Sequence, residues 1–317
     1  MDINPANLTA FFQNVDATWA SAYQSTDVWI DKVATTRASK SSQELYSWEQ
    51  MVPTLREWVG PRLTEPLAAY FYSLLNKRFE LTLSADVNMI EDDQYGVFFD
   101  KVRMAALRGK KWPDYTMYPV IQAGDSTLCY DGQNFFSKTH PINLYDPGFS
   151  VNSSTTQSNL FTSTPLTPDN LATVAQTMRT WVDEGGQPLG VKPKLLVIPP
   201  QLELTARNIL NAAFIAPANV GGNTQVGAND NVLKGYMDLL VIDELGVTDA
   251  TSWYVIDPTK PMKPFIWQLR KAPVLTPRVA PNDPSVFDLD QFLWGIKARG
   301  VAGYSLWWLA AKCKATA

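Results

Sequence analysis

The chain contains a single histidine, His140, from which acid–base chemistry could start. With Asp131 and Ser137 it can be written as a triad of the kind that activates a serine hydroxyl for nucleophilic attack. All three residues, however, fall within one short loop, which is a poor way to hold catalytic groups in a supported arrangement. We therefore expect the ring of His140 to pack or hydrogen-bond locally in a turn, and we predict no catalytic residue.

Metal and cofactor motifs are not evident either. Cys129, Cys313 and His140 lack the paired spacing that zinc ligands need, and both thiols are interpreted as reduced. The chain has neither a GxGxxG fingerprint nor a P-loop. Asp243-Glu244 follows an apolar run, where a carboxylate could bind ribose or a metal, but without the glycine fingerprint we expect it to end the strand. The sequence predicts no cofactor, no metal site and no enzyme activity.

One basic cluster stands out, between residues 101 and 111. Cations on a solvated helix face that compensate the helix macrodipole would explain it. The functional hypothesis is a weak contact with nucleic-acid phosphates that does not depend on base sequence. The net charge of −4 argues against a dedicated nucleic-acid binder. The candidate DNA-facing residues are Lys101, Arg103, Arg108, Lys110 and Lys111.

Composition sets the outer limits of the fold. A length of 317 residues allows two domains, and 45% hydrophobic residues supply enough material for a core. No signal peptide is visible, and no apolar stretch approaches the ~20 residues that a membrane span needs. Eleven tryptophans hint at a protein with extensive interfaces, where tryptophan is enriched.

A long amphipathic helix is predicted over residues 90–122. Apolar residues recur at steps of three and four from Tyr95 to Ala106, with acidic side chains before them and basic ones after, the order that the macrodipole favours. Pro113 either kinks one helix or begins a second. A nearly continuous helix would be about 45 Å long, which is too long to be wrapped in one compact core. We interpret it as a spine along which other elements lie.

A polar arm and an extended ribbon are expected before this spine. In the arm, residues 6–15 predict a short helix, and the Ser/Thr/Lys stretch that follows is expected to be extended or mobile. From residue 44 to 87, LYSWEQM and KRFELTLSADV are predicted to be the two strands of a ribbon with an elaborated, proline-broken tip. Because a two-stranded ribbon is barely stable alone, it should lean on its own chain or on a neighbouring subunit.

The rest of the chain falls into two parts. Residues 125–165 are expected to be turn-rich and loop-like, and Thr167-Pro168-Asp169 predicts the start of a helix. Residues 166–248 alternate strand-like and helix-like segments, which predicts a compact second domain with an exposed Gly/Asn-rich loop at 220–231. The last part contains long strand-like runs.

With these residues in view, the chain resembles the major head (capsid) subunits of Mu-like tailed phages. Matching segments extend over most of the chain and fit least well at 150–165 and 214–231. The segments that carry the resemblance are PTLREWVGPR (53–62), NKRFELTLSADVNMIEDD (76–93), KKWPD (110–114), LCYDGQNFFSKTHP (128–141) and RGVAGYSLWWLAAK (299–312).

The resemblance implies an α+β fold of the HK97-like capsid type. The implied parts are an N-terminal arm, an extended E-loop hairpin, a P-domain with the spine helix, an A-domain with a central sheet flanked by helices, and C-terminal strands of the P-domain. Their limits would be 1–43, 44–88, 89–165, 166–248 and 249–317, in that order.

The resemblance also implies a function in assembly. Such a subunit self-assembles through hexamers and pentamers into the icosahedral head shell around a double-stranded DNA genome. The shell would be assembled in the host cytoplasm, and the subunit would reside in the virion. Its partners would include a portal. Because only about forty residues precede the ribbon, a separate scaffolding protein is also implied. Triangulation number, cement proteins, cross-links, arm processing and host stay open. The ribbon should contact an adjacent subunit through Trp48, Arg56, Glu57, Trp58 and Arg62.

Two alternatives are kept beside this reading. An encapsulin-like nanocompartment would use a shell of the same fold around enzymes. A soluble α/β enzyme would use the region of Asp243.

Overall fold

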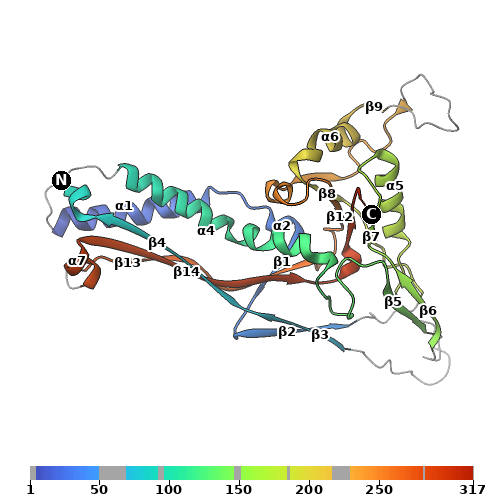
Figure 1. Cartoon of the computed structure of the whole chain (residues 1–317), viewed down its shortest axis with the longest axis horizontal. Helices are drawn as coiled ribbons and strands as arrows, with labels where there is room; N and C mark the ends of the chain where they lie inside the picture. The colour runs from blue at the N-terminus through green and yellow to red at the C-terminus, as the bar shows by residue number, and fades with distance from the viewer. Residues whose placement is uncertain are drawn as a thin grey trace.

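Helix α4 (Gly96–Gln122) runs along much of the length of the molecule, as Figure 1 shows. It continues through Pro113 and Pro119, and the short helix α3 (Val87–Glu91) precedes it. The predicted spine is confirmed, and no second helix begins at Pro113. The structure is a computed structural model, and it describes residues 5–49, 69–91, 96–145, 151–183, 186–215, 229–280 and 283–316.

A four-stranded sheet lies along the spine, in the order β1-β13-β14-β4. Its long central strands, β13 (Phe265–Arg278) and β14 (Gln291–Tyr304), pair antiparallel. Strand β4 (Lys77–Asp86) pairs with β14 along its whole length. The alternation in KRFELTLSAD therefore predicted a strand correctly but assigned it the wrong partner. The alternating pattern identifies a face to be buried, and pairing with β14 sets that face, with Leu81 and Leu83, against the side chains of α1 and α4.

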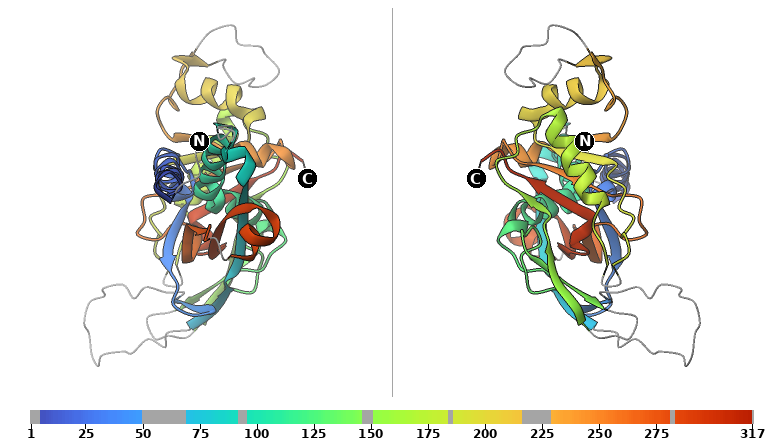
Figure 2. Two further views of the ribbon diagram at one scale, coloured as in Figure 1. Left: turned by 90° about the vertical axis from the view of Figure 1, so that its left-hand side faces the viewer. Right: turned by 90° about the vertical axis from the view of Figure 1, so that its right-hand side faces the viewer.

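The ribbon is formed by β2 (Gln43–Glu49) and β3 (Ala69–Leu75), which pair antiparallel. Its second strand thus comes from a segment that the sequence reading placed in the tip. In both views of Figure 2 the ribbon and helix α6 (Glu203–Asn211) lie at opposite ends of the molecule. The excursion from the body is real and its first strand is the expected one, but its second strand is β3 and not β4.

A helix forms in the arm, as predicted, but it is longer than residues 6–15, and its packing is not that of a polar arm. Helix α1 (Pro5–Gln24) packs against α4 along a stripe that buries Phe11, Val15 and Trp19. These residues recur at four-residue steps, which is the spacing of one helix face. Their cluster also contains Trp294 of β14, whose ring centroid lies 6.4 Å from that of Phe11. The arm is therefore part of the hydrophobic core between α4 and the four-stranded sheet.

The Ser/Thr stretch after α1 is also ordered. The short helix α2 (Ile30–Val33) leads into β1 (Ala34–Ala38), which pairs parallel with β13. Parallel pairing with an interior strand gives the backbone of this polar segment hydrogen-bond partners that its side chains did not predict.

Asp114 joins this arm to the spine. Its buried carboxylate accepts hydrogen bonds from the backbone N–H groups of Trp29 (3.3 Å) and Ile30 (2.9 Å), at the start of α2. Burial raises the pKa of Asp114 to about 6, although the two hydrogen bonds act in the opposite direction. Because this value lies above that of an unfolded aspartate, the folded state binds the proton more tightly. The stabilisation from protonation is complete below about pH 4 and is lost as pH rises through 6.

Substitution Asp114→Asn should remove this dependence. We expect the free energy of unfolding of the wild type, minus that of the variant, to fall between pH 4 and pH 7. Urea denaturation of both proteins at pH 4, 5, 6 and 7 measures the difference, and the subtraction cancels the titration of the other carboxylates. A difference that stays constant or rises over this range would contradict the assignment.

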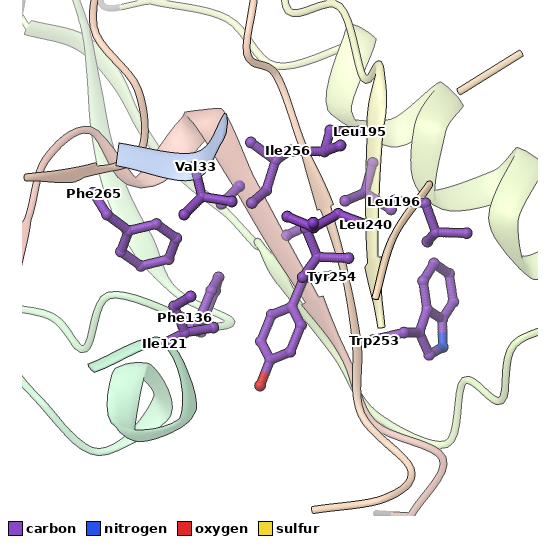
Figure 3. Close-up of a cluster of buried hydrophobic side chains, with 14 of the residues drawn as sticks. Val33, Ile121, Phe136, Leu195, Leu196, Leu240, Trp253, Tyr254, Ile256 and Phe265 are labelled. Atoms are coloured by element: carbon purple, nitrogen blue, oxygen red, sulfur yellow. The ribbon is translucent and has the colours of Figure 1, made fainter. Parts of the chain in front are cut away.

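A second sheet, of five strands in the order β11-β8-β12-β15-β7, lies on the right-hand side of the molecule in Figure 1, below α6. Figure 3 shows side chains of its central strands packed together with Ile121 and Phe136. Helix α5 begins after Thr167, whose side chain accepts a hydrogen bond from Asn170 N, as the sequence predicted. The elements are β7 (Leu160–Phe161), α5 (Pro168–Arg179), β8 (Leu195–Ile198), β11 (Asp238–Val241), β12 (Trp253–Ile256) and β15 (Ala310–Cys313).

Two strands of this sheet were expected elsewhere. β12 and β15 come from 249–317, which the sequence reading gave to the P-domain as a whole. Both are fully buried, and an uninterrupted apolar run such as that of β12 suits an interior strand covered on two sides. The C-terminal part is therefore divided between the two sheets, while the proposed domain limits stay a prediction.

Besides the long path from β4 through α4 to β7, the chain makes two short crossings between the sheets, from β12 to β13 and from β14 to β15. These crossings are hydrogen-bonded to one another, since Asp257 N donates to Leu309 O and Ser305 N donates to Pro264 O, both at 2.9 Å. The two sheets are thus connected by a pair of adjacent segments.

The region expected to be loop-like contains a hairpin of β5 (His140–Tyr145) and β6 (Val151–Gln157). Most of the 220–231 loop lies outside the described residues, between β9 (Phe214–Ile215) and β10 (Asn229–Asp230). Helix α7 (Pro284–Leu289) precedes β14. Within the described ranges, no helix combines the length and apolar character that crossing a membrane requires.

Candidate assembly interface

The sequence predicts five residues in and beyond the ribbon for contact with a neighbouring subunit. Trp48 lies in β2, opposite Tyr70 of β3. The other four predicted contact residues fall outside the described residues and stay predictions: Arg56, Glu57, Trp58 and Arg62.

One face of the ribbon root packs on its own subunit. Leu74 is buried against Ile266 and Val301, with Tyr72 beside them. The fit depends on Gly303, where an added Cβ would lie 2.6 Å from Leu74 Cδ1. The root is therefore supported by its own sheet, which is the first of the two supports expected for the ribbon, its own chain or a neighbouring subunit.

The opposite face of the root is open. Leu45 and Leu75 share this face, because their partners in register are Ser73 and Gln43, and each is 63% exposed. Burying both in a second molecule would contribute about 1–2 kcal/mol each. The ribbon thus presents apolar surface on the side turned away from its own sheet.

The structure separates the five predicted basic residues into two groups. Lys101, Arg108 and Lys111 are exposed on α4 at steps of seven and three, which places them on one stripe of the helix. Met104 lies within this stripe and is also exposed. The stripe offers three cations to an anionic surface.

The other two basic residues have partners beside the stripe. Arg103 forms an exposed ion pair with Asp100 at 2.6 Å. Lys110 places its Nζ 5.2 Å from the ring centroid of Tyr23 in α1. Both are therefore weaker candidates for contact with DNA.

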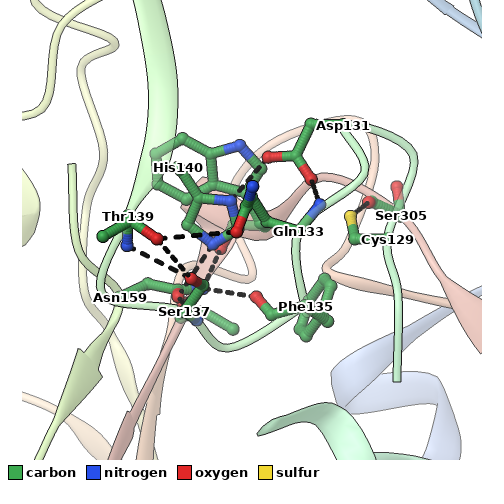
Figure 4. A network of polar contacts seen from close by, with 11 residues as sticks. Cys129, Asp131, Gln133, Phe135, Ser137, Thr139, His140, Asn159 and Ser305 are labelled. Atoms are coloured by element: carbon green, nitrogen blue, oxygen red, sulfur yellow. Dashed lines mark hydrogen bonds and ion pairs between the residues drawn. The ribbon is translucent and has the colours of Figure 1, made fainter. Parts of the chain in front are cut away.

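Only the His140–Asp131 half of the triad that the sequence argued against is formed, as Figure 4 shows. His140 is fully buried, with Nδ1 2.6 Å from Asp131 Oδ2 and Nε2 3.1 Å from Asn159 Oδ1. Its ring stacks on Trp307 at a centroid distance of 4.0 Å. Ser137 Oγ instead lies 3.4 Å from Thr139 Oγ1.

The surrounding hydrogen bonds fix the role of the imidazole. Asn159 Nδ2 donates to the carbonyls of Phe135, Trp307 and Ala310, and its Oδ1 accepts from Ser137 N. His140 Nε2 must therefore donate to that same oxygen, and it has no lone pair free to take a proton from a serine. As expected, the ring packs and hydrogen-bonds locally, although it stands at the start of β5 and not in a turn.

The remaining sequence candidates have structural roles. Cys129 and Cys313 are free and buried, and burial raises the pKa of both thiols, which disfavours the reactive thiolate. Asp243-Glu244 begins a 3-10 turn directly after β11, as a strand-ending role predicts. Over the described ranges, no group of three His, Cys, Asp or Glu side chains is placed to hold a metal ion.

Sequence reasoning missed a buried ionic group at the end of the spine. Lys312 of β15 is 3% exposed, and its Nζ donates to Gln122 O at 2.8 Å and lies 3.2 Å from Asp125 Oδ1. Lys314 pairs with the other oxygen of Asp125 at 2.9 Å. The only signal was a lysine inside the apolar run AAKC, which also fits a strand with one exposed face.

Comparisons with known proteins agree with this architecture. Residues 8–164, 157–245 and 241–317 match the family described as Mu-like prophage major head subunit gpT. The major capsid protein of Escherichia phage Mu is 27% identical over 312 residues, covering 77% of this chain and 100% of that protein. The Mu-like prophage FluMu major head subunit of Haemophilus influenzae is 24% identical over 283 residues, covering 89% and 65%.

A solved structure shares the fold over nearly the whole chain. A chain of the procapsid of bacteriophage JBD30 has 25% sequence identity and a TM-score of 0.62, covering 98% of this chain and 76% of that one. The α+β class is confirmed, and the arrangement agrees with an HK97-like capsid fold. Since the family match extends from residue 8 to residue 317, this chain belongs to the Mu-like prophage major head subunit family.

Proposed function

We propose that this protein is the major capsid protein of a Mu-like tailed phage and forms the head shell around double-stranded DNA. The match to the head-subunit family along almost the entire chain carries the proposal. It also favours a phage head over the encapsulin-like alternative. The enzyme alternative, which would use the region of Asp243, loses support because Asp243 begins a 3-10 turn after β11 and the family match is to a head subunit. A structural role in the virion is part of the proposal.

The shell grows by association of copies of the chain. Contacts that repeat around hexamers and pentamers are heterologous, and many modest contacts act together in one closed object. The exposed Leu45 and Leu75 support a contact through the ribbon, because their apolar surface is free in the single subunit. The tip residues beyond β2 extend this contact, and the 220–231 loop gathers near the local five- and six-fold axes.

Other partners belong to the same proposal. A separate scaffolding protein directs assembly in the host cytoplasm, and a portal occupies one vertex. Packaged DNA meets Lys101, Arg108 and Lys111 weakly and without sequence preference.

Electron microscopy of the purified full chain, co-expressed with its neighbouring genes, tests the shell function. Closed particles of uniform diameter, eluting at megadalton size, are the expected result. A protein that remains a small oligomer under every co-expression condition would overturn the proposal, and particles filled with an enzyme cargo would favour the nanocompartment.

The spine stripe can be tested separately. Changing Lys101, Arg108 and Lys111 to Glu should leave shell assembly intact and weaken binding of duplex DNA to disrupted shells. Losing three phosphate contacts should make the negative slope of log affinity against log salt concentration shallower by about 3 in total. Fluorescence anisotropy with a labelled duplex at several salt concentrations measures this slope.

A variant with the same charge change elsewhere serves as the control: Lys32→Glu, Lys192→Glu and Lys234→Glu, all exposed and outside α4. It should retain more of the slope than the stripe variant. Equal slopes for the two variants would show that total charge governs DNA contact, and loss of assembly in the stripe variant would make the stripe a subunit interface.

A further inference from the structure

Buried polar side chains meet at the root of the ribbon, where β1 turns into β2 and β3 ends. We call the set Ser39, Glu44, Asn76 and Gln268 the ribbon clamp. Gln268 is fully buried in β13, and Ser39 and Asn76 are also buried. Buried amides are costly unless they are hydrogen-bonded, so their partners show what the clamp holds.

Gln268 connects the sheet to both strands of the ribbon. Its Nε2 donates to Leu74 O at 3.2 Å in β3 and to Asn76 Oδ1 at 2.9 Å. Its Oε1 accepts from the hydroxyl of Tyr46 at 2.9 Å in β2. One rigid side chain of the body therefore holds the two strands at once.

Asn76 and Glu44 fix the turn that leads into the ribbon. Asn76 Nδ2 donates to Ser39 Oγ at 2.8 Å and to the backbone carbonyl of Ser41 at 2.9 Å. Glu44 Oε1 accepts from Ser39 Oγ, Lys40 N and Ser41 N at 2.7–3.0 Å. The hydrogen bonds from Ser41 and Lys40 lower the pKa of Glu44 to about 2, so the carboxylate stays charged in mildly acidic solution.

The clamp specifies the direction of the ribbon more strictly than apolar packing alone can. The apolar contact of Leu74 with Ile266 has no preferred angle of its own, whereas a hydrogen bond weakens steeply when its angle changes. A seven-residue strand extends about 23 Å, so an error of about 10° at the root displaces its far end by about 4 Å. Such a displacement is comparable to the spacing between neighbouring strands.

We propose that Gln268 and Asn76 are positioning residues that fix the direction in which the β2–β3 ribbon leaves the subunit, and thereby its fit onto a second copy of the chain. The first half of this statement concerns the single subunit. The second half rests on the proposed shell function.

Spin labels measure the direction of the ribbon in the isolated subunit. One label at Ala69→Cys, at the far end of β3, and one at Thr276→Cys on β13 report a distance, and the two native cysteines are buried. We compare the wild-type background with Gln268→Met, which keeps the length of the side chain and loses all of its hydrogen bonds to the ribbon. The width of the distance distribution should roughly double in the variant. An unchanged distribution would overturn the proposal.

Shell formation tests the consequence in the unlabelled full chain. Gln268→Met should lower the yield of closed shells about tenfold or more, because a small loss repeats at every contact. Val174→Ala is the stability control: it leaves a cavity under α5, far from the clamp in the sequence, and should form shells normally. Normal shells from Gln268→Met despite a broadened distribution would also overturn the proposal.

Two further results keep the test decisive. If Gln268→Met does not fold, Tyr46→Phe removes only the bond from β2 and should still broaden the distribution, and no broadening would overturn the proposal. If the wild type itself forms no shells, the shell function fails, and the spin-label comparison still decides whether the clamp sets the direction of the ribbon.

Discussion

Replacing residues 50–68 by the dipeptide Asn-Gly should yield a folded subunit that forms no shells. Glu49 and Ala69 face each other at the end of the β2–β3 pair, so a two-residue turn can join the strands. Asn-Gly suits such a turn because both of its central positions need positive φ. The ribbon root should remain folded, because Leu74 and its sheet contacts are untouched.

The loss of assembly should be large. The replacement removes Arg56, Glu57, Trp58 and Arg62 together, and buried Trp and Arg are the residues that most often anchor interfaces. Two anchors worth about 2 kcal/mol each would already lower association by at least about a hundredfold. Size-exclusion chromatography and electron microscopy measure the fraction of protein in particles, and circular dichroism checks the fold.

A Gly/Ser segment of the original length is the matched control. It restores the chain length without the side chains, and it should also fail to assemble if those side chains make the contact. Shells of normal size from the Asn-Gly variant would contradict the interface assignment, and shells from the Gly/Ser variant alone would show that only reach matters.

Substitution Asp125→Asn should destabilise the folded subunit by about 3–5 kcal/mol, the cost of leaving a buried charge without its partner. Lys312 would keep its bond to Gln122 O but lose the carboxylate, while the cation of Lys314 remains nearby. Burial already lowers the pKa of Lys312, and removing the carboxylate should lower it further. Urea denaturation at pH 7 measures the loss.

The double variant Asp125→Asn with Lys312→Met should recover much of this stability, because no charge is then left in the interior. Lys314→Met alone should cost no more than about 1 kcal/mol, since Lys314 is partly exposed. If the free energy of unfolding of Asp125→Asn lies within about 1 kcal/mol of the wild-type value, Asp125 is not what compensates the buried charge of Lys312.

Local patterns predicted those elements that local physics determines. The spine follows from its apolar repeat and the start of α5 from the Thr167 cap with Pro168 behind it. Helix α1 was predicted only in its first half, at residues 6–15, although Trp19 continues the helical spacing of Phe11 and Val15.

Strand partners were beyond local reasoning. Alternation in β4 identifies a face, but nothing in that segment says whether β2 or β14 lies beside it. The same limit applied to β12 and β15, whose sheet is decided by contacts between distant segments.

The candidate site was predictable only in outline. The resemblance placed the contact on the ribbon, but the clamp needed Gln268 of β13 and Asn76 after β3 to come together, and they are separated by 192 positions. A glutamine inside a strand can equally point to solvent, so its role is visible only in three dimensions.

The paired crossings between the two sheets determine how the subunit bears force. Two covalent strands side by side resist torsion, because twisting one sheet against the other would stretch both and break Asp257 N from Leu309 O. Bending about the line that joins them would leave these hydrogen bonds in place but would separate core side chains that the two sheets share, such as Tyr254 and Phe265. Torsion between the sheets is therefore resisted by backbone hydrogen bonds, and bending by the packing of a common hydrophobic core.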